Sequence, residues 1–255
     1  MEKWSELGKK LEEHVRPATF PVAVRFLEKG EEPPERSRRP REEAGEPIAL
    51  CQGLTLTRRR GLTMYFDRHE SSCPLAVSAL GWDEGEGLAF LPAFTLAMHY
   101  ARDEETAAGK AEAMARLEAG RCGGVVLSPL TRTRVEPHVV VVFGNPAQVM
   151  RLVQAVSRWT GERVQAGFGG IGGSCNEGIV GTFLGGEPRV ALPGNGDRVF
   201  AATQDDELIF AFPAAWADRV VEGLEATSAR GIRYPIPTFM NYRLPFIDLM
   251  AKYGT

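Results

Sequence analysis

The first apolar residues of the chain, Trp4, Leu7 and Leu11, recur at the spacing of one helix face. Residues 21–28 then alternate between apolar and polar, which is the period of a strand with one buried face. The same two patterns predict helices over residues 4–14, 48–61 and 71–81, and strands over residues 21–28, 62–66 and 122–130. Gly61 and Gly81 are the expected ends of the second and third helices.

An order of strand, proline and helix recurs in the rest of the chain. Residues 139–156 run from VVVVF through Pro146 into an amphipathic pattern, residues 207–224 repeat that order, and residues 87–101 look like a third copy. A proline in the first helical turn costs little, because the N–H that it lacks has no helical partner there. The repetition argues for an α+β or α/β body. We predict an α+β fold, one domain over residues 1–255 in which helices flank a mixed sheet.

Two segments lack these patterns. Residues 29–47 are dense in charge and proline, so they bury too little apolar surface to offset their ordering entropy. We predict a mobile, solvated surface loop there. The tail from Arg233 to Met250 is rich in proline and aromatic residues. It is expected either to wrap the core or to dock as a short helix on a neighbouring subunit, which would make the protein a homo-oligomer.

Composition and charge narrow the class of protein. Of the 255 residues, 44% are hydrophobic and 25% are charged, as in soluble globular domains. A net charge of −3 disfavours nucleic acid as a partner, because binding phosphates usually needs a basic surplus. The N-terminus lacks an apolar signal core, and no stretch approaches the ~20 apolar residues that span a bilayer. We therefore expect a cytoplasmic protein without a membrane partner, whose four cysteines are reduced.

The most informative stretch contains a run of glycines followed by a cysteine. Ser174 and Glu177 form the S-x-x-E pattern of a capping box, which predicts a helix with Ser174 as its N-cap and Cys175 as its first residue. A thiol at the positive end of a helix dipole has a lowered pKa. The resulting thiolate binds metals and attacks electrophiles. The alternative is a buried cysteine that packs as a small hydrophobe.

Two more cysteines repeat this placement. Cys73 follows Ser72, a candidate N-cap, and Cys51 lies near the start of a predicted helix. Thiolates that are distant in sequence can share an iron–sulfur cluster or a zinc ion. The chain has no C-x-x-C, which excludes a zinc ribbon or a ferredoxin motif. Cys122 stands at the start of a predicted strand and is expected to be structural.

Two loops are candidates for binding a small molecule. Glycines allow the backbone to approach a ligand closely, and the GNGDR segment is expected to be a turn that either presents charge to a ligand or closes a hairpin with a surface ion pair. The predicted ligand-binding residues are Gly169, Gly170, Gly172, Gly173, Ser174, Asn195, Asp197 and Arg198. The glycine run also matches G-x-G-x-x-G, but the preceding ERVQA is a poor core strand. A dinucleotide site is therefore not favoured.

The chain resembles the domain of unknown function 169 family from about residue 7 to 240, in the motifs PVAVRF, CQGLTLTRRRG, SSCPLAVSALG, VVVVFGNPAQVMRLVQA, GGSCNEGIVGTF, GNGDRVFAATQDDELIFAFP and RYPIP. The resemblance implies a single-domain cytoplasmic protein of bacteria or archaea, and no established activity. It implies that cysteines recur at the positions of Cys51, Cys73 and Cys175. A further cysteine that often precedes GDR is replaced here by Gly194 or Asn195. A shared metal would then have an open or different fourth ligand position, as catalytic centres need.

Three functions fit these patterns. The first is a metalloprotein in which Cys51, Cys73 and Cys175 hold an iron–sulfur cluster, zinc or another thiophilic metal beside a glycine-lined pocket, for redox or Lewis-acid chemistry on a small substrate. The second is a metal-free protein that binds a small ligand between the glycine run and the GNGDR loop. The third is a thiol enzyme with Cys175 as nucleophile and a histidine nearby.

Overall fold

The strands form one antiparallel sheet in the computed structural model, which describes residues 2–83 and 87–236. The strand order is β2–β3–β1–β4–β6–β5, and every neighbouring pair is antiparallel. The bounds are β1 Val22–Leu27, β2 Met64–Phe66, β3 Gly124–Pro129, β4 Val139–Gly144, β5 Arg189–Ala191 and β6 Leu208–Pro213. The predicted α+β class is confirmed. The sheet is antiparallel rather than mixed, since the parallel pairings, such as Ile48 with Ser71, are isolated bridges outside the strands.

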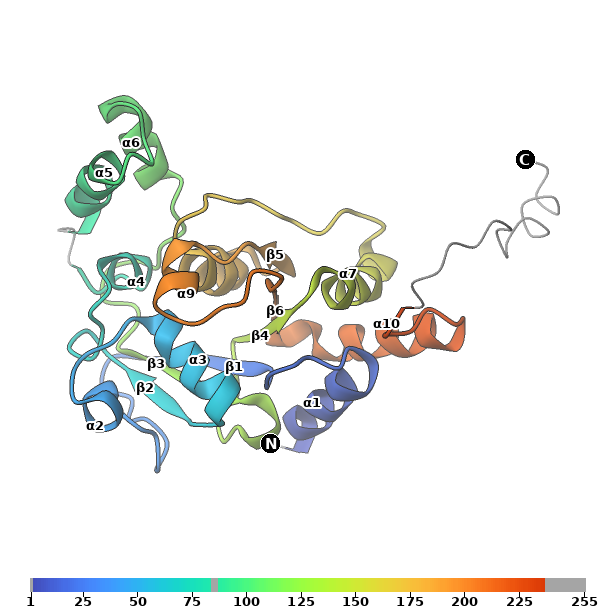
Figure 1. Cartoon of the computed structure of the whole chain (residues 1–255). Helices are drawn as coiled ribbons and strands as arrows, with labels where there is room; N and C mark the ends of the chain where they lie inside the picture. The colour runs from blue at the N-terminus through green and yellow to red at the C-terminus, as the bar shows by residue number, and fades with distance from the viewer. Residues whose placement is uncertain (1, 84–86, 237–255) are drawn as a thin grey trace.

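Helices cover both faces of this sheet. The α-helices are α1 Glu2–His14, α2 Pro40–Ala44, α3 Leu50–Arg60, α4 Pro74–Ala79, α5 Gly87–Ala97, α6 Glu104–Glu112, α7 Pro146–Thr160, α8 Gly181–Gly185, α9 Asn195–Val199 and α10 Ala217–Ala229. Two 3₁₀ turns, η1 Leu130–Arg132 and η3 Ala214–Trp216, and a π-helix, η2 Gly173–Val180, complete the elements. Figure 1 shows α1, α7 and α10 grouped on one side and α3, α4 and α9 on the other.

The central strand β4 shows why the valine run is buried throughout. Val139 and Val141 belong to the apolar cluster that contains α3, α4 and η2. Val140 and Val142 belong to the cluster under α1, α7 and α10. Successive side chains of a strand point to opposite faces, so a sheet covered on both faces needs apolar residues at every position of its central strand.

Two of the three predicted strand–proline–helix units are present. β4 leads through Asn145, which caps α7, into Pro146 at the first helical position, and β6 leads through Pro213 and η3 into α10. The third prediction, over residues 87–101, is wrong because the segment begins with helix α5 and Pro92 lies inside that helix. Leu91 and Thr95, which are four residues apart and buried, give α5 its inner face.

The prediction of a mobile loop over residues 29–47 needs correction, because part of this segment folds against the body as α2. Pro40 is buried at the start of that helix. The Arg39 guanidinium lies 3.1 Å from the carboxylate of Asp67, and the Arg41 N–H donates to Glu70 at 3.0 Å. These contacts offset part of the conformational entropy that is lost when the segment is ordered, which its few apolar residues could not do.

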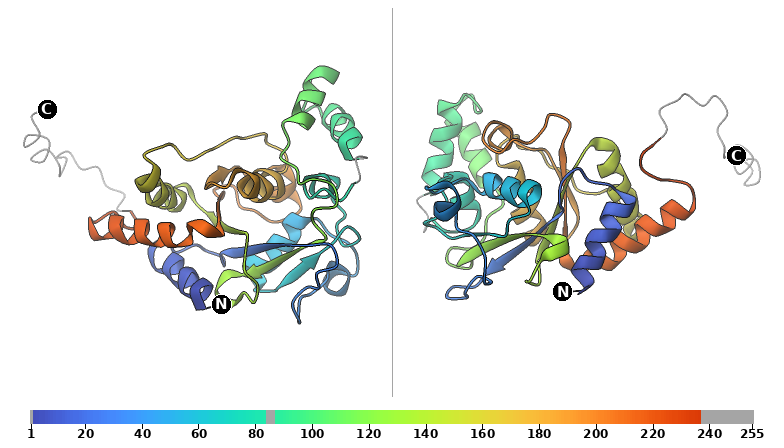
Figure 2. Two further views of the ribbon diagram at one scale, coloured as in Figure 1. Left: turned by 180° about the vertical axis from the view of Figure 1, so that it is seen from behind. Right: turned by 60° about the horizontal axis from the view of Figure 1, so that its bottom comes forward.

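The α5–α6 hairpin projects from the body beside α4 (Figures 1 and 2). The expected role of the tail falls mainly on residues 237–250, which lie outside the described ranges. Within residues 2–83 and 87–236, no helix combines the length and the apolar character that crossing a membrane requires.

Candidate functional site

The structure brings the three predicted thiols together at three helix N-termini. Cys51 lies in the first turn of α3, Cys73 is the N-cap of α4, and Cys175 is the third residue of η2. Cys73 and Cys51 both lie close enough to Cys175 for their charges to raise its pKa. We call Cys51, Cys73 and Cys175 the thiol cluster. Cys122 lies apart from it, buried, with its Sγ 3.2 Å from the Gly124 carbonyl, as expected for a structural residue.

Burial, rather than the helix dipole, sets the ionisation of these thiols. Desolvation raises the pKa of Cys51 to about 12, and the nearby Asp197 and Cys73 add to the shift. Desolvation also raises the pKa of Cys175 well above its ordinary value, with further contributions from Cys73, Asp197 and Cys51. The expectation of thiolates is therefore wrong for these two residues of the metal-free protein, because transfer out of water outweighs the dipole of a helix start. Cys175, 7% exposed and protonated at neutral pH, lacks the properties of a nucleophile.

Ser174 is not the N-cap of its helix. That position belongs to Gly172, whose φ of +71° is in the left-handed region that favours glycine. The Ser174 hydroxyl instead donates to the carboxylate of Asp197, and Glu177 accepts the Gly169 N–H at 2.6 Å. The predicted capping box is thus replaced by two longer-range contacts.

Asp197 joins η2 to the GNGDR segment. Besides the Ser174 hydroxyl, its carboxylate accepts the Gly194 N–H at 2.8 Å and the Ser174 N–H at 3.3 Å. Burial still raises the pKa of Asp197, against the effect of these hydrogen bonds. Gly173 allows η2 to lie close to the backbone that precedes α9, because a Cβ there would lie 2.1 Å from the Leu192 carbonyl oxygen.

The GNGDR segment folds as helix α9 rather than as the expected hairpin turn. Gly194 is its N-cap with an extended backbone, and Asn195 is exposed. Arg198 does not pair with Asp197; it donates to the Gln204 carbonyl at 2.6 Å and lies 3.7 Å from Asp205. The Asp197 carboxylate is thus engaged within the fold, and neither Asn195 nor Arg198 lines the cavity described next.

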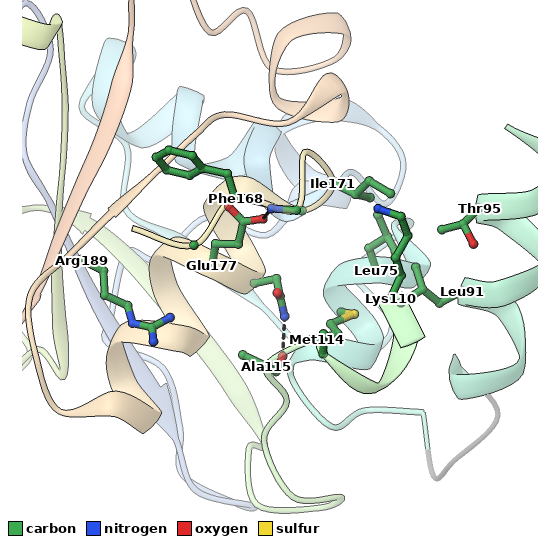
Figure 3. Close-up of a pocket in the computed structure, with 15 residues that line it drawn as sticks. Leu75, Leu91, Thr95, Lys110, Met114, Ala115, Phe168, Ile171, Glu177 and Arg189 are labelled. Atoms are coloured by element: carbon green, nitrogen blue, oxygen red, sulfur yellow. Dashed lines mark hydrogen bonds between the residues drawn. The ribbon is translucent and has the colours of Figure 1, made fainter. Parts of the chain in front are cut away.

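A cavity of about 340 Å³ lies between the glycine run, η2 and the α5–α6 hairpin (Figure 3). Its apolar wall consists of Leu75, Leu91, Ala113, Met114, Ala115, Phe168 and Ile171. Its polar lining consists of Thr95, Lys110, Asn176, Glu177 and Arg189, with backbone from Gly167, Gly169 and Gly172. We call this cavity the hairpin pocket. The Asn176 side-chain amide donates to the Ala115 carbonyl and so ties η2 to the segment after α6.

The hairpin pocket is lined by two basic side chains, Lys110 and Arg189, and one acidic side chain, Glu177. Figure 3 shows Glu177 between Arg189 on one side and Lys110 on the other. Neither basic side chain forms an ion pair with any residue that the structure describes. Burial raises the pKa of Glu177, which the Gly169 N–H and Arg189 oppose. Its Oε2 is buried without a hydrogen-bond partner among the described residues.

Only part of the predicted ligand-binding set lines this pocket. Gly169 and Gly172 do so. Gly170 adopts a left-handed turn with a φ of +74° beside the pocket without lining it. Gly173 and Ser174 are buried behind it. Lys110 and Arg189 stand on separate elements with no local motif, so the sequence does not predict their role, and Glu177 fits a capping box by its spacing alone.

The thiol cluster does not form a preassembled site for a single metal ion. Among the residues of the described ranges, no three His, Cys, Asp or Glu side chains are arranged to hold one. The cluster adjoins the hairpin pocket all the same: the Cys175 Sγ lies 3.9 Å from the carbonyl of Gly172, and Cys73 is two residues from Leu75; both Gly172 and Leu75 line that pocket.

Comparison with known proteins gives two matches. The model of the DUF169 family, described as uncharacterised ArCR, matches residues 10–223. An uncharacterised protein of Methanocaldococcus jannaschii, MJ0308, is 28% identical over 206 residues, which cover 80% of this chain and 86% of the relative. No solved structure matches.

Proposed function

Since this chain belongs to the DUF169 family, which is described as uncharacterised, we propose from the geometry of its site that it binds a small amphipathic organic acid in the hairpin pocket. The single observation that supports this proposal is the pairing of an apolar wall with two basic side chains in one cavity of about 340 Å³. Small-molecule sites are typically concave, largely apolar and supplied with a few polar groups that fix orientation.

The lining suggests how such a ligand would lie. Leu91, Met114 and Phe168 offer an apolar surface for its body. Lys110 or Arg189 would bind its acidic group, because neither side chain forms an ion pair with a residue that the structure describes. The unpartnered Oε2 of Glu177 would accept a hydrogen bond from a hydroxyl or amine of the same molecule.

We expect Lys110→Gln to weaken the binding of an apolar anion by about tenfold, since a hydrogen bond to a charged group contributes about 1.5–3 kcal/mol. The probe is anilinonaphthalene sulfonate, whose fluorescence rises in an apolar site, and the measurement is its dissociation constant. Lys9→Gln is the matched control, because Lys9 is an exposed lysine on α1, far from the pocket in sequence and outside its lining. Equal affinities in the Lys110 and Lys9 variants would contradict the role of Lys110.

A second candidate function, binding of a thiophilic metal centre, is favoured by the thiol cluster itself. Three of the four cysteines, from segments far apart in the sequence, are gathered at one place. Thiolates are soft ligands that suit iron–sulfur clusters and zinc. Because the thiols of Cys51 and Cys175 are protonated in the metal-free protein, binding would release protons and require the thiols to close around the group.

Anaerobic reconstitution with iron and sulfide tests this second candidate. If the cluster binds iron, the protein becomes brown, and Cys51→Ser, Cys73→Ser and Cys175→Ser each lower the bound iron to less than about half, whereas Cys122→Ser retains it. Iron content and visible absorption are the measurements. A colourless protein, or equal loss in the Cys122 variant, would leave the three thiols as packing residues of the core.

A further inference from the structure

A second cavity has a predominantly basic polar lining. It has a volume of about 370 Å³. Its polar lining includes four arginines, Arg36, Arg38, Arg132 and Arg134. We call it the arginine cavity. Two of these arginines come from the charged segment before α2, and the other two come from η1 and the turn that follows it.

The arginine cavity is built over one end of the sheet. Val126 and Ser128 form part of its lining, and they alternate along β3 with Val125 and Leu127, which belong to the core cluster on the other face. The cavity thus lies on the face of the sheet that α1, α7 and α10 cover further along. The Ser128 hydroxyl is already bonded to Thr133, so the arginines are the main polar groups available to a ligand.

The four guanidinium groups are not neutralised within the fold. None of them lies within ion-pair distance of a carboxylate among residues 2–83 and 87–236. Glu35 is the only acid among the described residues of the lining. The chain has a net charge of −3, so these four unpaired arginines form a local positive charge of the opposite sign around one cavity. Their mutual repulsion is relieved when an anion binds.

One side-chain contact and one backbone conformation characterise this arrangement. The Arg132 guanidinium lies 5.2 Å from the centroid of the Phe20 ring, in a cation–π contact. The backbone of Arg36 has a φ of +69°, which is in the region that favours glycine. Non-glycine residues held in that region are concentrated at binding sites, because the surrounding structure has to stabilise them.

We infer that the arginine cavity binds a compact polyanion, a small molecule that carries two or more phosphate groups. Guanidinium groups match phosphate and carboxylate oxygens in a bidentate geometry. No aromatic residue lines the cavity among those described, so it offers no stacking surface for a nucleobase or for single-stranded nucleic acid. This inference does not depend on the function proposed for the hairpin pocket.

Calorimetric titration of the full chain with pyrophosphate tests it, with ionic strength held constant by sodium chloride. We expect saturable binding that Arg38→Gln combined with Arg134→Gln weakens by at least about tenfold, since two charge-assisted contacts are lost. The matched control combines Arg158→Gln with Arg230→Gln, which removes the same charge from exposed positions on α7 and at the end of α10. Should the first double variant misfold by circular dichroism, Arg36→Gln replaces it and is expected to weaken binding in the same direction.

Three outcomes would overturn the assignment. These are the absence of saturable binding by the wild-type protein, an equal loss in the control variant, and tighter binding of a single-stranded oligonucleotide than of pyrophosphate. An equal loss would indicate that net charge alone attracts the anion. Tighter binding of the oligonucleotide would indicate a nucleic-acid surface instead.

Discussion

Glu207→Ala is expected to lower the free energy of unfolding by about 3–5 kcal/mol, because it leaves the buried charge of Arg58 without a partner. Arg58 is fully buried at the end of α3, and its Nη2 donates to Glu207 Oε2 at 2.9 Å while its Nη1 donates to Oε1. The Arg58 guanidinium also lies 4.0 Å from the centroid of the Phe143 ring in β4. The pair therefore fixes α3, which carries Cys51, against the sheet. Urea denaturation followed by circular dichroism measures the change.

The control for this substitution is Asp206→Ala, which removes an exposed carboxylate from the adjacent position and is expected to change stability little. The pH dependence gives a second test. Burial opposes ionisation of Glu207, yet the hydrogen bonds from Arg58 and Gln204 lower its pKa overall. The stabilisation is therefore complete above the pKa of glutamate in the unfolded chain and is lost as the pH falls through the lower folded value. An Asp206 variant as unstable as the Glu207 variant would contradict this account.

Asp197→Ala is expected to lower the free energy of unfolding by about 2–4 kcal/mol, because each buried donor left without a partner costs about 1–3 kcal/mol. The substitution orphans the Ser174 hydroxyl and the N–H groups of Ser174 and Gly194. Removing the desolvation cost of the carboxylate offsets part of this loss. Urea denaturation measures the effect.

The loss of Asp197 should also expose the thiol cluster. Asp197 holds α9 against η2, and the Cys51 Sγ lies 4.0 Å from the Gly196 carbonyl in α9. We therefore expect iodoacetamide to alkylate Cys51 and Cys175 faster in the Asp197→Ala protein than in the wild type, as measured by peptide mass spectrometry. Asp205→Ala, which removes a fully exposed carboxylate from the same region, is the control. Unchanged stability and unchanged alkylation in the Asp197 variant would show that this carboxylate does not hold the two helices together.

The local patterns of the sequence placed the cysteines near helix starts but assigned the wrong caps. Cys73, rather than Ser72, is the N-cap of α4, and Gly172, rather than Ser174, is the N-cap of η2. The ionisation of those thiols could not be predicted in the same way. It depends on burial, which is a property of the whole packed structure.

The groups that the sequence analysis missed are those that depend on contacts between distant residues. Ser174 fits a capping box by spacing, but Asp197, 23 residues further on, takes its hydroxyl. Lys110 and Arg189 belong to no motif, and they line one cavity only because the fold places α6 and β5 around it. A prediction of the pocket therefore required the tertiary structure.

Hydrogen exchange with and without saturating anilinonaphthalene sulfonate tests the proposed ligand site most directly. If the hairpin pocket binds the anion, protection of backbone amides is concentrated in residues 167–177 and 110–115, the two segments that supply most of its lining. Protection confined to the exposed apolar residues of α5 and its end, such as Phe90 and Met98, or absent from residues 167–177, would contradict the proposal.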